Sequence, residues 1–248
     1  MALLTEERVR LMSDNGTRGP VVVRREDVLT PSARSWLREH RVEVVYPQGE
    51  AREEAGAKAP AGPKYRTLFG AGLEEKPEHM THLRGNLLVF KDHPRIAFRG
   101  MIDLLEAEIA LCQQVCVREG IPALAEELEE VLGFVRRFIR FDVLEEPVGE
   151  VRLCGLGPEE LRERSHYPEK YYGQPHFLLH YTDSPAILAV NKVRAVARQT
   201  ELAAYRAFRD ENGAVTREDI LQGLNRLSSL LWIFMIKLKA GTYGNTGA

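Results

Sequence analysis

The feature of this 248-residue sequence that most constrains its fold is a helical spacing of apolar residues that begins near residue 97. Apolar residues there recur every three or four positions and so share one helix face: Phe98, Ile102, Leu105, Ile109 and Cys112. The same spacing predicts a second helix over residues 121–139. No strong strand signal follows residue 97, so we expect this part of the chain to be helical.

Three further helices are indicated by proline and capping signals. A short helix is expected from near Pro158, a long one over residues 184–208, and a last one over residues 216–239 with Asp219 as a capping partner. Together the five helices predict a mainly α fold, a five-helix bundle preceded by a small α/β extension.

The first 50 residues have the pattern of that α/β extension. Val21–Val23 is a β-branched strand seed, and Thr30-Pro31 provides an N-cap and a first-turn proline for a helix that ends near residue 40. Residues 42–46 are expected to form a second strand.

Composition suggests the remaining boundaries. Residues 51–76 are rich in Ala, Gly, Pro, Lys and Glu, and we interpret them as a flexible linker. The bundle domain is then expected over residues 77–240, followed by a disordered tail at 241–248.

The charges are balanced, with 34 basic and 36 acidic residues and a formal net charge of −2. This balance argues against a nucleic-acid coat or a general membrane-surface binder, which need an excess of positive charge. Arginine nevertheless outnumbers lysine 26 to 8. The excess reflects either codon bias or a few arginines that hold phosphates by bidentate hydrogen bonds.

Three cysteines, no signal peptide and no apolar run of about 20 residues predict a cytoplasmic protein with reduced thiols. Cys112 and Cys116 share a helix face and are expected to be buried apolar residues. The pairs His79/His82 and His176/His180 have metal-compatible spacings but no third convergent ligand. A helical metal-binding protein that uses His176 and His180 is a further alternative.

A polar stripe runs along the long helix over residues 184–208. It consists of residues at positions i, i+3, i+7 and i+10: Asn191, Arg194, Arg198 and Glu201. The stripe is either a solvated face or a ligand-binding face. The last helix carries Asn225, Ser228, Ser229 and Trp232 on one side, as buried hydrogen-bonding structure or as a ligand contact.

A third polar cluster precedes the first bundle helix. Lys91, Arg95 and Arg99 surround its expected start, where free backbone N–H groups favour anions. The cluster is either a phosphate cradle or an ordinary charged loop.

Four segments taken in order resemble the ATP:cob(I)alamin adenosyltransferases, most closely the ethanolamine-utilisation type, a relative of the propanediol-utilisation type. The segments are Pro77-x-His-x-Thr-His-Leu83, Lys91-x-x-Pro-Arg-x-x-x-Arg-Gly-x-x-Asp103, Val193-Arg-x-x-x-Arg-x-Thr-Glu201 and Leu224-Asn-Arg-Leu-Ser-Ser229. Residues 29–34 also resemble the N-terminal extension of the ethanolamine-utilisation enzymes. The resemblance covers about residues 77–238.

This resemblance implies a homotrimer of five-helix bundles whose sites lie between subunits and bind ATP and cobalamin. ATP would donate its 5′-deoxyadenosyl group to cob(I)alamin, and triphosphate would leave. Arg198 and Lys91 would be catalytic, stabilising the departing triphosphate. The residues implied to bind ATP are Thr81, Lys91, Arg198, Glu201 and Asn225. Arg194 would pair with Asp103 of a neighbouring subunit.

The sequence departs from the resemblance at one place. Ethanolamine-type enzymes carry a His and a Cys-Cys-x-x-Cys cluster before the Pro77 region, whereas residues 60–76 here contain neither Cys nor His. We therefore expect no resident metal site there, and a Mg²⁺ ion bound with ATP. Aromatic residues are candidates for an apolar wall facing cobalamin, with core packing as the alternative for each: Phe98, Phe134, Phe138 and Phe141.

A function of another class stays open. The chain could be a non-catalytic cobalamin carrier or a microcompartment assembly protein on the same bundle, with the N-terminal unit as a docking module. For the enzyme, we expect ATP, cobalamin and a cobalamin-reducing protein or a bacterial microcompartment as partners, and neither nucleic acid nor membrane.

Overall fold

The structure is a computed structural model that describes residues 3–14, 21–23, 27–40, 42, 44–45 and 63–244. The chain falls into two compact units, residues 1–60 and residues 61–248. Within the described residues, no helix is both long and apolar enough to cross a membrane.

The N-terminal unit is a small α/β structure, as the sequence predicts. It pairs β1 (Leu3–Leu4) with β3 (Val28–Leu29) and β2 (Val21–Val22) with β4 (Val44–Val45), both in parallel. Helices α1 (Glu6–Asp14) and α2 (Pro31–Glu39) accompany them. The expected start of α2 is confirmed, because the Thr30 hydroxyl accepts a hydrogen bond of 3.3 Å from the Ala33 amide. The sequence patterns did not predict α1 or β1.

The predicted linker is wrong for residues 63–76, and its residues 51–62 lie outside the described chain. Strands β5 (Tyr65–Thr67), β6 (Gly72–Leu73), β7 (Met80–Arg84) and β8 (Leu87–Phe90) form a sheet of order β6-β5-β8-β7. Gly70 has a φ of 82° in the β5–β6 turn, a conformation that favours glycine. Gly70 and Gly72 of the predicted linker therefore belong to a hairpin, and β7 and β8 extend the sheet into the predicted bundle domain.

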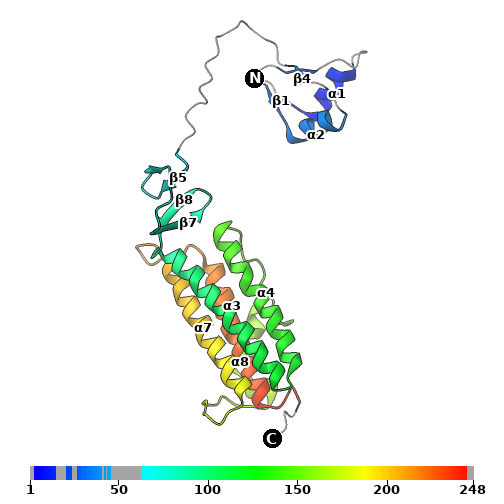
Figure 1. Cartoon of the computed structure of the whole chain (residues 1–248). Coiled ribbons are helices and arrows are strands. Elements are labelled where there is room, and N and C mark those ends of the chain that lie inside the picture. The colour runs from blue at the N-terminus through cyan, green and yellow to red at the C-terminus, as the bar shows by residue number, and fades with distance from the viewer. Residues whose placement is uncertain are drawn as a thin grey trace. The chain divides into compact units, whose positions relative to one another are not determined.

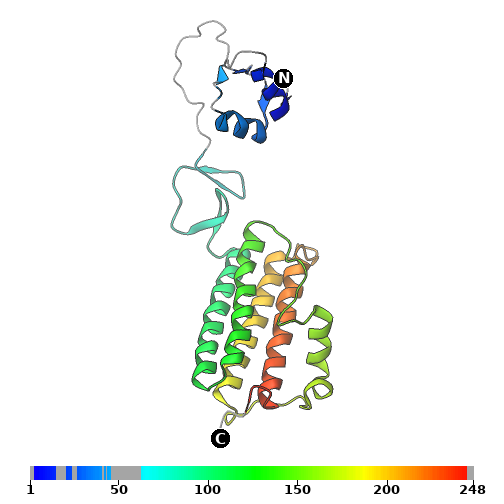
Figure 2. The same ribbon diagram turned by 90° about the vertical axis from the view of Figure 1, so that its right-hand side faces the viewer.

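The mainly helical fold is confirmed, with its long helices side by side (Figures 1 and 2). These are α3 (Pro94–Arg118), α4 (Pro122–Val143), α7 (Pro185–Phe208) and α8 (Glu218–Lys239). The short helices are α5 (Pro158–His166), as predicted, and α6 (Pro168–Tyr172), which was not. His93 and Ser184 cap α3 and α7 by accepting backbone N–H bonds.

Aromatic and small residues fix how the long helices pack. Phe98 of α3 meets Phe208 of α7 edge-on, with ring centroids 5.5 Å apart. Gly223 of α8 faces Phe134 and Phe138 of α4 so closely that a Cβ at this position would lie 3.3 Å from the Phe134 ring and 3.1 Å from the Phe138 ring. The absence of a side chain thus lets α8 approach α4, and most of the buried core lies among these four helices.

Two expectations at the end of the chain are wrong. The Asp219 carboxylate does not cap α8. It accepts bonds from the Val148 amide and from Arg217, which ties α8 to the segment after α4. In the predicted tail, the Tyr243 side chain packs against the core, its hydroxyl donates to Glu127, and burial raises its pKa. Residues 245–248 lie outside the described chain.

Candidate functional site

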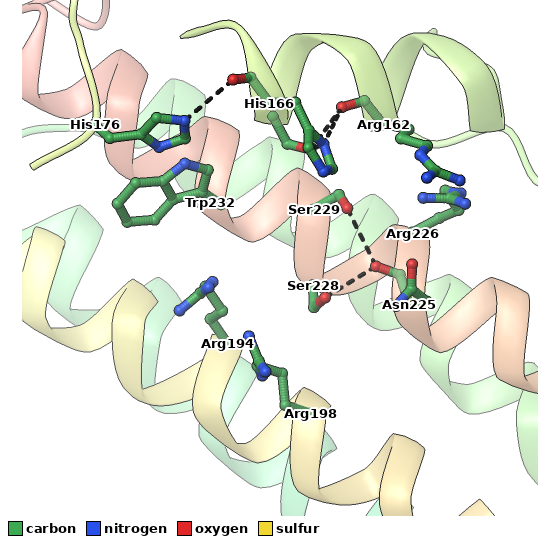
Figure 3. A pocket seen from close by; sticks show the side chains of 11 residues that line it. Arg162, His166, His176, Arg194, Arg198, Asn225, Arg226, Ser228, Ser229 and Trp232 are labelled. Atoms are coloured by element: carbon green, nitrogen blue, oxygen red, sulfur yellow. Dashed lines mark hydrogen bonds between the residues drawn. The ribbon is translucent and has the colours of Figure 1, made fainter. Parts of the chain in front are cut away.

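A pocket of about 560 Å³ opens among α5, α7, α8 and the segment that follows α6 (Figure 3). Its lining is dominated by four arginines, two histidines and small polar residues, with one tryptophan. The arginines are Arg162, Arg194, Arg198 and Arg226. No carboxylate is among the described residues that line the pocket, so its positive charge is not neutralised from within its walls.

Arg194 and Arg198 project from α7 into this pocket, one turn apart (Figure 3). The guanidinium of Arg194 lies 5.1 Å from the ring centroid of Trp232, a cation–π contact. Its Nε is buried and has no hydrogen-bond partner in the described chain. Burial lowers the pKa of Arg194, and the charge of Arg198 lowers it further. Arg194 thus lacks a counter-charge of its own.

A side-chain hydrogen bond of Asn225 links α8 to α7 beside the pocket. The Asn225 side-chain amide donates a hydrogen bond of 3.0 Å to Glu201. The hydroxyls of Ser228 and Ser229 donate back to the Asn225 carbonyl at 2.9 and 3.3 Å. The bond to Glu201 orients the side-chain amide of Asn225, as a positioned ligand contact requires.

The structure therefore brings together a large part of the predicted polar stripe. Arg194, Arg198 and Asn225 line one pocket, and Glu201 bonds to Asn225. The position of these side chains in a pocket favours the ligand-binding interpretation over a fully solvated face.

Two predicted ATP residues do not reach this pocket within one chain. Thr81 lies on β7, and Lys91 follows β8, where its ammonium pairs with the exposed Glu78 carboxylate at 3.1 Å. Asp103 is exposed on α3, and no described carboxylate forms an ion pair with Arg194. A single chain assembles only one half of the predicted site.

The pocket contains residues that the sequence patterns missed. Arg162, Ser165 and His166 come from α5, and only the packing of α5 against α8 brings them to the site. The repeated arginines and the histidine of α5 were the sole available signal, and on a short polar helix they do not differ from a solvated face.

His176 lines the pocket wall. Its ring stacks on Trp232 with centroids 5.7 Å apart, and its Nε2 lies 3.1 Å from the His166 carbonyl. His180 points elsewhere, with Nδ1 2.8 Å from the Thr182 hydroxyl. The described residues contain no group of three His, Cys, Asp or Glu side chains that could hold a metal ion.

Arg95 and Arg99 do not form a phosphate cradle. Both donate Nε–H bonds of 2.6 Å to the two carboxylate oxygens of Asp142, which is fully buried at the end of α4. Arg99 also donates to the His82 and Leu83 carbonyls of β7. The two guanidiniums are committed to an internal ion cluster that joins α3, α4 and β7.

The four phenylalanines proposed to face cobalamin are buried in the bundle. The exposed fractions of Phe98, Phe134, Phe138 and Phe141 are 0%, 3%, 0% and 7%. Phe134, Phe138 and Phe141 pack edge-to-face in series. Their burial favours the alternative of core packing, since the i, i+4 and i+7 spacing that places three of them on one stripe is also the spacing of a core face.

The chain is similar in sequence to cobalamin-modifying enzymes. Residues 72–238 match the family described as "Cobalamin adenosyltransferase". "Corrinoid adenosyltransferase EutT" of Escherichia coli K12 is 31% identical over 221 residues, covering 84% of this chain and 81% of the relative. The protein of the same name from Salmonella typhimurium LT2 is 29% identical with the same coverage.

A solved structure also shares the fold. It is a variant of a PduO-type ATP:corrinoid adenosyltransferase from Lactobacillus reuteri, complexed with cobalamin and ATP. The TM-score is 0.52 at 16% identity, and the match covers 66% of this chain and 91% of that one.

Proposed function

The chain belongs to the cobalamin adenosyltransferase family, and from that premise we propose that it transfers the 5′-deoxyadenosyl group of ATP to cob(I)alamin. The observation that carries the proposal is the pocket with four arginines and no described carboxylate in its lining. A pocket of this charge suits a polyphosphate, and its volume of about 560 Å³ is typical of small-molecule sites.

The reaction needs little covalent chemistry from the protein. The Co–C5′ bond forms as the C5′–O bond breaks, cobalt goes from Co(I) to Co(III), and the electron pair of the broken bond leaves with triphosphate. Because cob(I)alamin is the nucleophile, the chain has to position ATP and stabilise charge on the leaving group. We assign the charge stabilisation to Arg198 and the orientation of ATP to Asn225, which Glu201 holds in place.

The remaining residues implied by the family complete this site in a homotrimer. We propose that Thr81 and Lys91 of one copy contact the phosphates bound in the pocket of another, and that Asp103 pairs with Arg194 across the same interface. Two observations support this arrangement: Thr81 and Lys91 lie outside the pocket of their own chain, and Arg194 retains a buried Nε without a partner.

Magnesium fits the site as an ion carried by ATP. No described carboxylate lines the pocket, so its side chains provide no ligand set for a resident Mg²⁺. The ATP phosphates would supply the hard oxygen ligands, and Mg²⁺ would neutralise part of their charge. We place the enzyme in the cytoplasm and, since its relatives are named EutT, in cobalamin supply for ethanolamine utilisation, with a cobalamin-reducing protein or a microcompartment as partner.

The test is an anaerobic assay with chemically reduced cobalamin and MgATP. We expect the absorption spectrum of cob(I)alamin to convert to that of adenosylcobalamin, with one triphosphate released per adenosyl group transferred. If cobalamin binds but no adenosylcobalamin forms, the chain is a carrier and the proposed activity is wrong.

A further inference from the structure

A second pair of arginines occupies the opposite side of the pocket from Arg194 and Arg198. Arg162 comes from α5 and Arg226 from α8, and Figure 3 shows both guanidiniums at the same end of the pocket. Burial lowers the pKa of Arg226, and the positive charge of Arg162 lowers it further. Neither forms an ion pair with a carboxylate of the described chain.

Arg226 also has an unsatisfied donor. Its Nε is buried and has no hydrogen-bond partner among the described residues, and burial is the largest cause of its lowered pKa. A buried donor without a partner costs roughly 1–3 kcal/mol. The charge of Glu201 raises the pKa of Arg226, but the Glu201 carboxylate already accepts a hydrogen bond from Asn225. Two repelling cations and an orphan donor indicate a missing anion.

The pair is held on rigid structure. Leu161 of α5 is fully buried, which anchors the helix, and the Ser165 hydroxyl and His166 Nδ1 lie 2.9 and 2.8 Å from the Arg162 carbonyl. Arg226 lies in the middle of the long helix α8, whose hydrogen bonds fix its backbone. Both guanidiniums can therefore present their N–H groups to one anion without reorganising the helices.

We propose that Arg162 and Arg226 form a phosphate subsite of the pocket, separate from the charge stabilisation assigned to Arg198. This inference rests on the proposed function, because it takes the phosphate to belong to a substrate. Two substrates carry such a group: ATP has its triphosphate, and cobalamin has the phosphodiester of its nucleotide arm. Planar guanidiniums bind either group by paired N–H···O bonds.

The test compares Arg162→Gln and Arg226→Gln with Arg206→Gln, an exposed arginine of α7 that does not line the pocket. Initial rates are measured anaerobically with ATP varied, with cobalamin varied, and with cobinamide, which lacks the phosphodiester, in place of cobalamin. We expect the KM of one substrate to rise about tenfold in both pocket variants, equivalent to about 1.4 kcal/mol. Arg206→Gln keeps the wild-type values.

The substrate whose KM rises is the one whose phosphate binds to Arg162 and Arg226. If it belongs to ATP, the KM for ATP rises with either corrinoid. If it belongs to cobalamin, the KM for cobalamin rises and the KM for cobinamide does not. The subsite is overturned if both KM values stay within threefold of wild type, or if the variants change the subunit assembly, which would identify the missing anion as a carboxylate of a second copy.

Measurements of thermal stability and of ligand binding test the subsite independently of catalytic activity. Removing one of two repelling cations is expected to leave Tm unchanged or raise it, whereas loss of a purely structural contact would lower it. Titration calorimetry measures the affinity of the pocket for inorganic triphosphate and for cobalamin, even if the wild-type protein makes no adenosylcobalamin. Binding of both compounds unaltered by Arg162→Gln would then refute the subsite.

Discussion

Two groups of arginines in this protein have opposite electrostatic environments. Arg95 and Arg99 share the buried carboxylate of Asp142, and both donate bonds of 2.6 Å to it. No described carboxylate lines the pocket that contains the other four arginines. Arg194 and Arg226 each have a buried Nε without a hydrogen-bond partner among the described residues. The first group has its counter-charge inside the fold. We propose that an anion from outside the chain supplies the counter-charge of the second group.

This difference separates structural from functional arginines. A guanidinium paired with a buried carboxylate holds elements together, and its loss is felt in folding. A guanidinium without a counter-charge destabilises the ligand-free protein, and its removal weakens ligand binding. Substitutions in the two groups should therefore affect different measurements.

The largest expected effect is on folding, in the Asp142 cluster. Asp142→Asn removes the buried counter-charge that two mostly buried guanidiniums share and should lower the free energy of unfolding by about 3–5 kcal/mol. Urea denaturation measures this, with Asp92→Asn, an exposed residue of the same region, expected to change it by less than about 0.5 kcal/mol. Equal stabilities of the two variants would show that the cluster does not hold the fold.

The next effect is on turnover, in the pocket. Arg198→Ala removes a proposed stabiliser of the leaving triphosphate and should lower kcat about 10²–10³-fold. Its urea midpoint should not fall, because Arg198 forms no ion pair with a described carboxylate. Arg206→Ala on the same helix is the matched control and should keep wild-type turnover. Wild-type turnover in Arg198→Ala would remove this residue from the site.

A third substitution gives the pocket arginines a counter-charge from within the chain. Ser229→Asp places a carboxylate among the pocket arginines and should raise the KM for ATP about tenfold, since substrate must displace an internal counter-charge. The same variant should raise the Tm of the free protein. Ser229→Asn, which matches its size without its charge, should do neither, and a similar loss of ATP affinity in both variants would point to steric blockage.

The smallest effect concerns the helix cap beside the Asp142 cluster. His93 Nδ1 accepts the Arg95 amide, so His93→Ala should cost about 1 kcal/mol. Burial, with the charges of Arg95 and Arg99, lowers the pKa of His93. His93 therefore binds a proton more readily in the unfolded chain than in the native one. Its contribution to the free energy of unfolding is fully present above pH about 6.5 and declines as the pH falls below that value.

Urea midpoints between pH 7.5 and 5 check this sign. His93→Asn keeps a capping acceptor without the titration and should show a shallower decline than wild type. A decline of the same steepness in both proteins would assign the pH dependence to other groups.

The sequence predicts the helical part of the fold well, because its helices carry a strong apolar period and clear caps. Ser184 and Pro185 start α7 as predicted, and Thr30 caps α2. The β5–β6 hairpin was missed because glycine and proline indicate both turns and linkers, and only pairing with β8 distinguishes them. The sequence could not decide between core packing and a ligand-facing role for the four phenylalanines, because core and ligand-facing stripes share one period.

The site was predictable only in part. Arg194, Arg198 and Asn225 were found because each helix carries its polar residues on one face. Arg162 was missed because its position depends on α5 packing against α8. The opposite roles of Arg99 and Arg198 could not be separated, because the carboxylate that decides them, Asp142, lies 43 residues from Arg99 in sequence.

The most direct test of the account is a structure of the protein with ATP and cobalamin bound. We predict that the nucleotide occupies the α5–α7–α8 pocket, with Arg198 and Asn225 within hydrogen-bond distance of it, while Arg95 and Arg99 remain bonded to Asp142. A nucleotide bound elsewhere, or phosphates held by Arg95 and Arg99 after they leave Asp142, would contradict the distinction between paired and unpaired arginines.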